Sequence, residues 1–371
     1  MGGGLAVSRR PPDYAIIGTV LTLLAVGLVM VFSSSSVRAL GETQDAYHYL
    51  KRQLAWAILG LGAMFAVMRV DYWEVRKHAR LFFLLTLLTL ILVLIPGVGL
   101  TAGGARRWLG FGAMRFQPSE LMKLAIVVYM AWALSRASGR IHDFARGVLP
   151  YVVLLGLVFF LVLQQPDLGT AVAIGGTVIV MIFAAGARVA HLIYLGLAAV
   201  PVLIYAVVGA EYRMSRWLAF VDPFADPQGS GFHIIQALYA LGSGGLFGLG
   251  LGNSRQKFFY LPAEHTDFIF AILGEELGFV GGVFVIGLFL ILAWRGFNVA
   301  MSAPDSFSSL VATGVTSMVV FQALLNIGVV SGILPITGVP LPLVSFGGSS
   351  LVPTLAGIGI LLNISRHRRV A

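Results

Sequence analysis

The sequence predicts an all-α integral membrane protein built as a bundle of about ten transmembrane helices. Of its 371 residues, 58% are hydrophobic and only 11% are charged, whereas about 25% of the residues of an ordinary soluble domain are charged. Many apolar runs reach about 18 residues or more, which is long enough to cross a hydrocarbon core of about 30 Å as a helix. The alternating strands of a membrane barrel, about ten residues each, are not seen.

Ten apolar segments are long enough to count as spans. The fifth and sixth are separated only by the tight turn Gln164-Gln165-Pro166-Asp167, so nine or eleven spans are alternatives. The chain shows neither a repeat of about 20–50 residues nor an inverted duplication, so residues 1–371 are predicted to form a single membrane domain. The predicted spans are 13–32, 54–68, 81–95, 118–134, 148–163, 168–185, 189–208, 267–294, 310–333 and 343–364.

The placement of lysine and arginine predicts the orientation, because short cytoplasmic loops of membrane proteins carry an excess of these residues. If the N-terminus is cytoplasmic, fourteen lie in short segments on that side and ten fall outside. Both termini are therefore predicted to be cytoplasmic. The net charge of +9 is then mainly a signal of topology, with anionic lipid head groups as partners of the inner basic residues, and nucleic-acid binding is not indicated. The fourteen residues are Arg9, Arg10, Arg69, Arg76, Lys77, Arg80, Arg136, Arg140, Arg146, Arg188, Arg295, Arg366, Arg368 and Arg369.

Two further absences narrow the class. No cleavage site of small residues follows the first apolar segment, which is also longer than the apolar core of a signal peptide, so we keep it as a span. The chain has no cysteine, which excludes disulfides, cysteine-ligated zinc, iron–sulfur clusters and a thiol nucleophile.

Three stretches outside the spans are long enough to contribute to a site. The first, 97–117, is predicted to be a flexible, glycine-containing turn that presents Arg106, Arg107 and Trp108 at the outer surface. These side chains could grip an anionic head group. Simple anchoring at the membrane interface is the alternative, because tryptophan and arginine are both common there.

The largest stretch, 209–266, is predicted to be an extracytoplasmic loop between the seventh and eighth spans. Within it, 232–241 is apolar but too short to span, so it is expected to lie in the interface or to re-enter the membrane. The glycines Gly248, Gly250 and Gly252 follow no strand and do not give the spacing G-x-G-x-x-G, so a nucleotide-binding fold is rejected.

The third stretch, 331–350, contains three prolines and no charge. Prolines break helices, and the pair Gly347 and Gly348 lets the backbone approach a neighbour closely, so polar backbone groups here must face protein or a wet cavity. One interpretation is a broken helix that lines a substrate cavity, with Ser345 and both glycines as candidate binding residues. A purely structural kink is the other.

Ionisable residues in the spans cost about 2.5–3.5 kcal/mol each near the bilayer centre, so each is expected to have a partner or a function. Glu120 and Lys123 share one helix face, either as an ion pair or with Lys123 meeting a substrate phosphate. Asp167 begins the sixth span, as a helix cap or as the partner of Lys123 or an arginine. Glu275 and Glu276 are adjacent, so they are predicted to point about 100° apart, to form no common site and to be structural.

Asp267 is the strongest candidate for chemistry. Thr266 is predicted to cap the eighth helix, which makes Asp267 a first-turn residue whose carboxylate the exposed helix amides keep ionised. At the water boundary this carboxylate can reach a sugar hydroxyl, although simple capping remains an alternative. His265 is expected either to orient a substrate oxygen or to serve as an interfacial hydrogen-bonding group.

Four segments carry a resemblance to a known family. They are 116–123 (FQPSELMK), 222–231 (DPFADPQGSG), 250–278 and 340–350 (PLPLVSFGGSS), and they resemble the SEDS family in its own order across almost the whole chain. The stretches 254–262 and 362–367 are more similar to the FtsW/SpoVE division and sporulation branch than to the RodA elongation branch. The family more often has P-E-A-H-T-D where this chain has P-A-E-H-T-D, which puts a role for Glu264 in doubt, and it often has tyrosine at the position of Phe346.

The resemblance implies a ten-helix peptidoglycan glycosyltransferase in the bacterial cytoplasmic membrane, which polymerises lipid II at the outer face. Asp267 matches the essential catalytic aspartate of the family and would act as general base on the acceptor hydroxyl. Undecaprenyl pyrophosphate would leave, with inversion to a β-1,4 linkage, and its tail would lie in an apolar groove between helices. The cations that could hold the pyrophosphate are Arg52, Arg106, Arg107, Lys123, Arg255 and Lys257.

The resemblance also implies partners. These are lipid II, the nascent glycan strand, a class B penicillin-binding protein as transpeptidase, and other membrane proteins of the divisome or elongasome. No cytosolic cofactor is implied. Mg²⁺ or Mn²⁺ could share the work, with Asp267 or Asp167 as ligands, but the chain shows no compact metal-ligand spacing.

Two alternatives from other classes are a lipid II flippase and a non-catalytic scaffold for a transpeptidase. The missing inverted repeat counts modestly against a transporter. A carboxylate placed to act as a base has no purpose in a scaffold, so the glycosyltransferase is the preferred interpretation.

Overall fold

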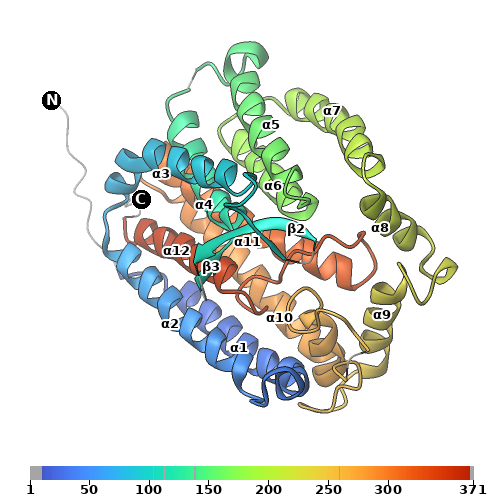
Figure 1. The fold of residues 1–371 in the computed structure, drawn as a ribbon. Helices are drawn as coiled ribbons and strands as arrows, with labels where there is room; N and C mark the ends of the chain where they lie inside the picture. The colour runs from blue at the N-terminus through green and yellow to red at the C-terminus, as the bar shows by residue number, and fades with distance from the viewer. Residues whose placement is uncertain (1–10, 103, 112–113, 138, 259, 368–371) are drawn as a thin grey trace.

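The structure is a computed structural model that describes residues 11–102, 104–111, 114–137, 139–258 and 260–367. Arg9, Arg10, Arg368 and Arg369 of the predicted cytoplasmic set lie outside these ranges. The described chain forms a helical bundle with one small sheet (Figure 1). Its helices are α1 (Tyr14–Thr43), α2 (His48–Arg69), α3 (Tyr72–Leu92), α4 (Pro118–Leu134), α5 (Leu149–Leu163), α6 (Leu168–Ala184), α7 (Val189–Val208), α8 (Glu211–Val221), α9 (Phe232–Gly244), α10 (Ile269–Met301), α11 (Ser306–Val330) and α12 (Gly348–Ser365), with a π-turn (Phe144–Val148) before α5 and a 3-10 turn (Pro223–Ala225) after α8.

The all-α membrane fold class is confirmed. Each of the ten predicted spans overlaps one helix, and the two remaining helices, α8 and α9, lie in the predicted loop 209–266. Seven helical segments in the described ranges are long and apolar enough to cross a membrane, namely α1, α2, the π-turn with α5, α7, α10, α11 and α12. α6 is a shorter apolar helix. The exact number of spans stays a prediction.

The core of the bundle is formed by α4, α11 and α12, which are buried along most of their length. Small residues let neighbouring helices approach closely, as is usual in membrane bundles. At Gly359, for example, an added Cβ would lie 2.5 Å from the main-chain oxygen of Met64. α7 lies at the rim, on the side away from α1 and α2 (Figure 1), and only His191 and Ala206 of this helix are buried.

A three-stranded antiparallel sheet occupies the segment that was predicted to be a flexible turn. It consists of β1 (Leu100–Ala102), β2 (Ala105–Phe111) and β3 (Met114–Phe116), in that order. Side chains alternate along a strand, so Arg106 and Arg107 leave β2 on opposite faces. Arg106 donates to the carbonyl of Leu94 at 3.1 Å, and Arg107 donates to that of Gln165 at 2.7 Å.

α10 is interrupted at Gly278, whose φ of 69° and ψ of −168° no helix contains. The glycine-rich segment after α9 fills the break. The amides of Leu249 and Gly250 donate to the carbonyls of Glu275 and Glu276 at 3.0 Å each. In return, the amide of Phe279 donates to the carbonyl of Gly245 at 2.9 Å. The glycine-rich segment, which was rejected as a nucleotide-binding loop, therefore satisfies the polar groups of a broken helix.

Several helix ends meet at one end of the bundle, which we call the basic end. Arg295, near the end of α10, forms an ion pair with Asp13 at the start of α1, at 2.6 Å. The side chain of Asn363 in α12 donates to the carbonyl of Met68 in α2 at 2.8 Å. The start of α1 and the end of α12 thus lie on the same side of the bundle, as the sequence predicts.

Candidate functional site

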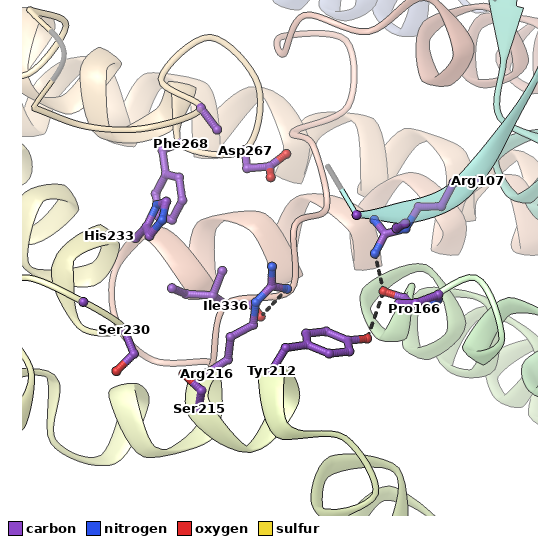
Figure 2. A pocket seen from close by; sticks show the side chains of 14 residues that line it. Arg107, Pro166, Tyr212, Ser215, Arg216, Ser230, His233, Asp267, Phe268 and Ile336 are labelled. Atoms are coloured by element: carbon purple, nitrogen blue, oxygen red, sulfur yellow. Dashed lines mark hydrogen bonds between the residues drawn. The ribbon is translucent and has the colours of Figure 1, made fainter. Parts of the chain in front are cut away.

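Two cavities meet at Asp267 and Arg107, the two residues that line both of them. The loop cavity, about 570 Å³, lies among β2, α8, α9 and the turn before α10 (Figure 2). The helix cavity, about 350 Å³, lies among β2, the starts of α4 and α6, and the segment before α12. The loop cavity is lined by Gly104, Ala105, Arg107, Pro166, Tyr212, Ser215, Arg216, Gly229, Ser230, His233, Ala263, Asp267, Phe268 and Ile336. The helix cavity is lined by Arg107, Trp108, Gln117, Glu120, Asp167, Thr170, His265, Thr266, Asp267, Gly338, Pro340, Phe346, Gly347, Ser349 and Ser350.

The main chain around Asp267 is clamped from two sides. The side-chain amide of Asn326 in α11 donates to the carbonyl of Asp267 at 2.7 Å. The hydroxyl of Ser345 donates to the carbonyl of Thr266 at 2.6 Å and accepts from the amide of Leu341 at 2.8 Å. These bonds tie the turn before α10 to α11 and to the segment 341–346, so they fix the main chain that carries Asp267.

The predicted capping arrangement is wrong. α10 begins at Ile269, its capping position is Phe268, and no side chain caps it. The hydroxyl of Thr266 donates instead to the carbonyl of Ala263 at 3.3 Å. Ala263 has a φ of 56°, and this left-handed residue closes a tight turn that uses up the residues expected in the first helical turn.

The environment of Asp267 makes it a stronger base than an exposed aspartate. It lies before α10, and burial raises the pKa of its carboxyl to about 6, helped by the negative charge of Asp167 and opposed by Arg216, Arg107 and His265. Burial outweighs the nearby positive charges, so the exposed helix amides do not set this pKa as predicted. A carboxyl with a pKa of about 6 is mostly ionised at neutral pH and accepts a proton readily.

Positive charge reaches the loop cavity from two elements (Figure 2). Arg107 extends from β2 and donates to the carbonyl oxygens of Gln165 and Pro166. Arg216 extends from α8, where its guanidinium is 3.5 Å from the carbonyl of Ile336. The hydroxyl of Tyr212 also donates to Pro166, at 3.1 Å, so α8 is tied to the turn between α5 and α6.

His233 of α9 completes the loop cavity. Its ring stacks on Phe268 with centroids 5.8 Å apart, and its buried Nδ1 has no hydrogen-bond partner among the described residues. Burial, followed by the charge of Arg216, lowers the pKa of His233. A neutral imidazole thus lines the same cavity as Asp267.

The sequence did not identify Arg216, Tyr212 or His233 as site residues. A partial signal was available, because Tyr212 and Arg216 are four apart and share one face of α8. What the sequence lacked was the tertiary placement of α8 and α9 over the turn that carries Asp267.

Many predicted site residues are brought together in the helix cavity: Arg107, Glu120, Asp167, His265, Thr266, Asp267 and Gly347. Asp167 caps α6 by accepting from the amide of Thr170 at 3.1 Å, and it also accepts from the side chain of Gln117 at 3.0 Å. His265 packs between the rings of Tyr49 and Phe346.

Lys123 forms the ion pair with Glu120 at 2.7 Å and donates to the side-chain oxygen of Gln322 at 2.6 Å. Glu120 lines the helix cavity and Lys123 does not. Gly348 begins α12, where an added Cβ would lie 2.2 Å from the ring of Trp56. Its lack of a side chain is thus a packing requirement.

The remaining predicted cations line neither cavity. Arg52 and Arg255 are exposed, and Arg106 leaves β2 on the face opposite to Arg107. Lys257 is buried in an ion pair with Glu276 at 3.3 Å. Glu264, whose role was in doubt, is buried against Arg38 at 2.8 Å.

Glu275 and Glu276 bind one turn together, which corrects the prediction that they cannot share a site. Glu275 accepts from the hydroxyl of Ser254 and from the amide of Arg255, at 2.5 and 3.0 Å. Glu276 accepts from the amide of Ser254 at 3.3 Å and from the hydroxyl of Ser33 at 2.7 Å. The turn wraps over the helix and reaches both carboxylates, although they diverge.

Metal binding is weakly supported. Among the residues that the structure describes, no group of three or more His, Cys, Asp and Glu side chains could hold a metal ion. Asp167 and Asp267 do line one cavity. Such a pair fits Mg²⁺ only if substrate phosphates supply further ligands, as they commonly do.

Comparison with known proteins identifies the class. Residues 14–370 match the model of the FtsW, RodA and SpoVE family, described as "Cell cycle protein". The chain belongs to this family.

Relatives and solved structures agree with this assignment. The chain is 48% identical over 365 residues to stage V sporulation protein E of Bacillus subtilis, covering 98% of this chain and 100% of that protein. It is 45% identical over 359 residues to the probable peptidoglycan glycosyltransferase FtsW of Geobacter sulfurreducens, covering 97% and 96%. It resembles a chain of a peptidoglycan synthase complex with a TM-score of 0.79 and 35% identity, covering 96% and 98%. It also resembles the rod shape determining protein RodA of Thermus thermophilus with a TM-score of 0.70 and 33% identity, covering 97% and 98%.

Proposed function

We propose that this chain is a peptidoglycan glycosyltransferase that polymerises lipid II into β-1,4-linked glycan strands, for cell division or cell-wall growth. The observation that carries the proposal is the position of Asp267, a carboxylate of raised pKa in the wall between two cavities. A glycosyl transfer needs a donor and an acceptor on either side of one base, and this arrangement offers both places.

Asp267 is the general base of the proposed reaction. Its carboxylate takes the proton from the 4-hydroxyl of the acceptor N-acetylglucosamine as that oxygen attacks the anomeric carbon of the donor. The new bond forms on the face opposite to the bond that breaks, so the α-linkage becomes β. The electron pair of the broken bond leaves on undecaprenyl pyrophosphate.

The loop cavity is the proposed donor site, because it contains Arg107 and Arg216 and no carboxylate besides Asp267 in its described lining. Two guanidinium groups can stabilise the charge that develops on the leaving pyrophosphate, and a partly enclosed site strengthens this effect. The side chains of Ser230 and His233 line the same cavity and can hydrogen-bond the donor.

A narrow apolar recess beside the loop cavity offers a path for the polyprenyl tail. The two share Pro166, Tyr212, Arg216 and Ile336, and the recess continues past Leu168, Val207 and Trp217 toward α7. α7 is exposed on most of its surface. The tail would therefore pass from the arginines toward the lipid along a mostly apolar lining, in which Arg213 and Thr337 are further polar residues.

The helix cavity is the proposed acceptor site. Its described lining includes the carboxylates of Glu120 and Asp167 and the side chains of Gln117 and Ser349. Groups of this kind accept and donate the hydrogen bonds that sugar hydroxyls require. The predicted residues Thr266, His265 and Gly347 lie in the same lining and are included in the proposal.

A divalent cation, Mg²⁺ or Mn²⁺, is compatible with this arrangement. Because Asp267 serves as the base, Asp167 would be the protein ligand, and the pyrophosphate of the substrate would supply further ligands. It would add positive charge at the leaving group.

We assign the active site to the outer face of the bacterial cytoplasmic membrane and both termini to the cytoplasm. The basic end carries Arg69, Arg76, Lys77 and Arg80, as a cytoplasmic end should. The two cavities lie toward the opposite ends of α2 and α3. The strand β2, which follows α3, lines both cavities, and Tyr49 in the first turn of α2 packs on His265 of the helix cavity.

The proposed partner is a class B penicillin-binding protein that crosslinks the new strands, with other divisome or elongasome membrane proteins around the pair. The similarity to a chain of a synthase complex that coordinates polymerization and crosslinking supports this. Identities of 48% to SpoVE and 45% to FtsW, against 33% to RodA, favour the division and sporulation branch.

The test is reconstitution of the purified chain on lipid II, with its transpeptidase partner present. We expect glycan strands from the wild type and from Asp143→Asn, an exposed carboxylate far from the cavities, and none from a folded Asp267→Asn variant. Undiminished strands from Asp267→Asn would overturn the proposal. Translocation of lipid II without any polymer would indicate a flippase, and strands that depend on the partner alone would indicate a scaffold.

A further inference from the structure

A second charged cavity lies at the basic end, away from the site described above. It measures about 480 Å³ and lies between the first turns of α3 and the last turn of α4. Its described lining consists of four cations and two indole rings, with no acidic side chain: Trp73, Arg76, Lys77, Arg80, Trp132 and Arg136.

Two arginines of this cavity pack on one indole ring, and none of its three arginines has an ion-pair partner among the described residues. The guanidinium groups of Arg80 and Arg136 both lie over the ring of Trp132, at 3.9 and 4.7 Å from its centroid. Arg76 lies over the ring of Trp73 at 5.1 Å. No carboxylate of the described residues forms an ion pair with any of the three arginines. Like charges held this close repel one another, and a bound anion relieves that repulsion.

The acidic residues nearby, Asp71, Glu74 and Asp305, do not line the cavity. Glu74 approaches Lys77 at 3.8 Å, but both side chains are more than half exposed and Glu74 does not line the cavity. An exposed pair of this kind is largely screened by water. Lys77 is therefore still available to a ligand.

An apolar stripe begins where the charges end. Leu81, Leu84, Leu85 and Leu88 follow Arg80 along α3, and each is more than half exposed. Their spacing puts them on one side of the helix, in line with Lys77 and Arg80. A ligand with a phosphate at one end and an acyl chain at the other matches this continuous surface, whereas a soluble anion or a peptide would use only the charged part.

We propose that this cavity is a binding site for the phosphate head group of an anionic phospholipid of the inner leaflet. The phosphate lies between Arg80 and Arg136, Arg76 and Lys77 supply further charge, and an acyl chain follows the leucine stripe of α3. The indoles of Trp73 and Trp132 lie at the level of the head groups, which is where tryptophan is enriched in membrane proteins. Basic pockets between helices on this side of a membrane are suited to such head groups. The site goes beyond the proposed glycosyl transfer and does not depend on it.

The test uses the full chain in phosphatidylcholine nanodiscs with a small, varied fraction of phosphatidylglycerol, and native mass spectrometry to count retained lipid. We expect the wild type to retain phosphatidylglycerol in preference to phosphatidylcholine. The double variant Arg80→Gln with Arg136→Gln should weaken retention roughly thirty-fold, because each arginine near an anionic head group raises the affinity about five-fold. The matched control, Arg140→Gln with Arg146→Gln, removes two exposed arginines that do not line the cavity and should keep the preference.

Four results would overturn the proposal. Equal loss in both double variants would mean diffuse attraction to a basic surface. No preference for phosphatidylglycerol in the wild type would remove the lipid as ligand, whether the cavity then takes an acidic peptide or nothing. Competition by glycerol phosphate as strong as by phosphatidylglycerol would assign the cavity to a soluble anion. If the glutamine pair fails to fold, Arg80→Lys with Arg136→Lys keeps the charge, and loss of retention in that folded pair would equally contradict the site.

Discussion

The side-chain amide of Asn326 in α11 donates to the main-chain carbonyl of Asp267 at 2.7 Å, and it donates to the carbonyl of Val339 at 2.8 Å as well. One buried amide therefore fixes both the turn that carries the proposed base and the segment that faces it. Asn363 makes a comparable bond at the basic end, to the carbonyl of Met68 at 2.8 Å.

Asn326→Leu should show whether this amide positions Asp267 for the reaction or only stabilises the fold. The change leaves two carbonyls unsatisfied, at a cost of about 1–3 kcal/mol for each one that stays buried. Because Asp267 then shifts, polymerisation on lipid II should fall at least tenfold. The control Asn363→Leu should also lower the melting temperature, yet leave the rate close to that of the wild type. Equal rates in the two variants would contradict a positioning role for Asn326.

Asp267→Asn should be more stable than the wild type at neutral pH. The folded protein holds this carboxyl at a pKa of about 6, above the ordinary value of 3.8, so it binds a proton more tightly than the unfolded chain. The stability that this tighter proton binding contributes is fully present below about pH 4, and it is lost as the pH rises through about 6. The variant escapes this loss, which is about 3 kcal/mol at most. The difference in melting temperature between the variant and the wild type should therefore be small at pH 4.5 and largest at pH 7.5.

The polymerisation rate should fall about tenfold per pH unit below pH 6, as Asp267 becomes protonated. Arg216 is the strongest of the charges that lower this pKa. Arg216→Gln should therefore move the acid limb to higher pH, in addition to lowering the maximal rate, whereas Arg216→Lys should hold it in place. A limb that stays fixed in Arg216→Gln would mean that Arg216 does not act on the base.

Arg107 and Arg106 provide a matched pair on adjacent positions of β2. Arg107→Gln should lower the maximal rate roughly 10²-fold, because one charged donor to the leaving group is lost. Arg106→Gln removes the same charge from the opposite face and should leave the rate within a few-fold of the wild type. The maximal rates of the two variants are measured at a saturating concentration of lipid II. Similar losses of rate in both would show that only the loss of surface charge matters.

Gly278→Ala should be among the most damaging substitutions in α10. An added Cβ would lie 2.3 Å from the amide nitrogen of Gly248, and the positive φ is itself strained for alanine, by about 1–3 kcal/mol. Gly287, in the same helix, has no neighbour within 4 Å, so Gly287→Ala should be neutral or slightly stabilising. Folded yield and melting temperature of the two variants test this, and equal stability would mean that the break in α10 is not required.

Much of the fold follows from local signals. Long apolar runs predict helices, since only helices and closed barrels satisfy their backbone in lipid, and this placed a helix at each of the ten predicted spans. Pro118 at the start of α4 and Asp167 at the start of α6 mark helix beginnings that the structure reproduces.

The failures share a cause, which is contact between distant segments. The strands β1 to β3 were predicted to be a flexible turn, because their pairing depends on packing rather than on a long alternating pattern. The side chain of Arg107 could not be distinguished from that of Arg106 until β2 gave them opposite faces. The break at Gly278 reads as ordinary helix until the segment after α9 is seen to fill it.

Asp267 and Arg107, which line both cavities, also bear on how one round of transfer follows another. In the proposed reaction the lengthened strand stays attached to the carrier lipid that entered on the acceptor side. Before the next addition that lipid and its sugars have to thread past Asp267 into the donor side. Asp267 thus also lies on the path by which the product moves from the acceptor site to the donor site. The length of the strand then depends on how often the product dissociates from the enzyme during this step.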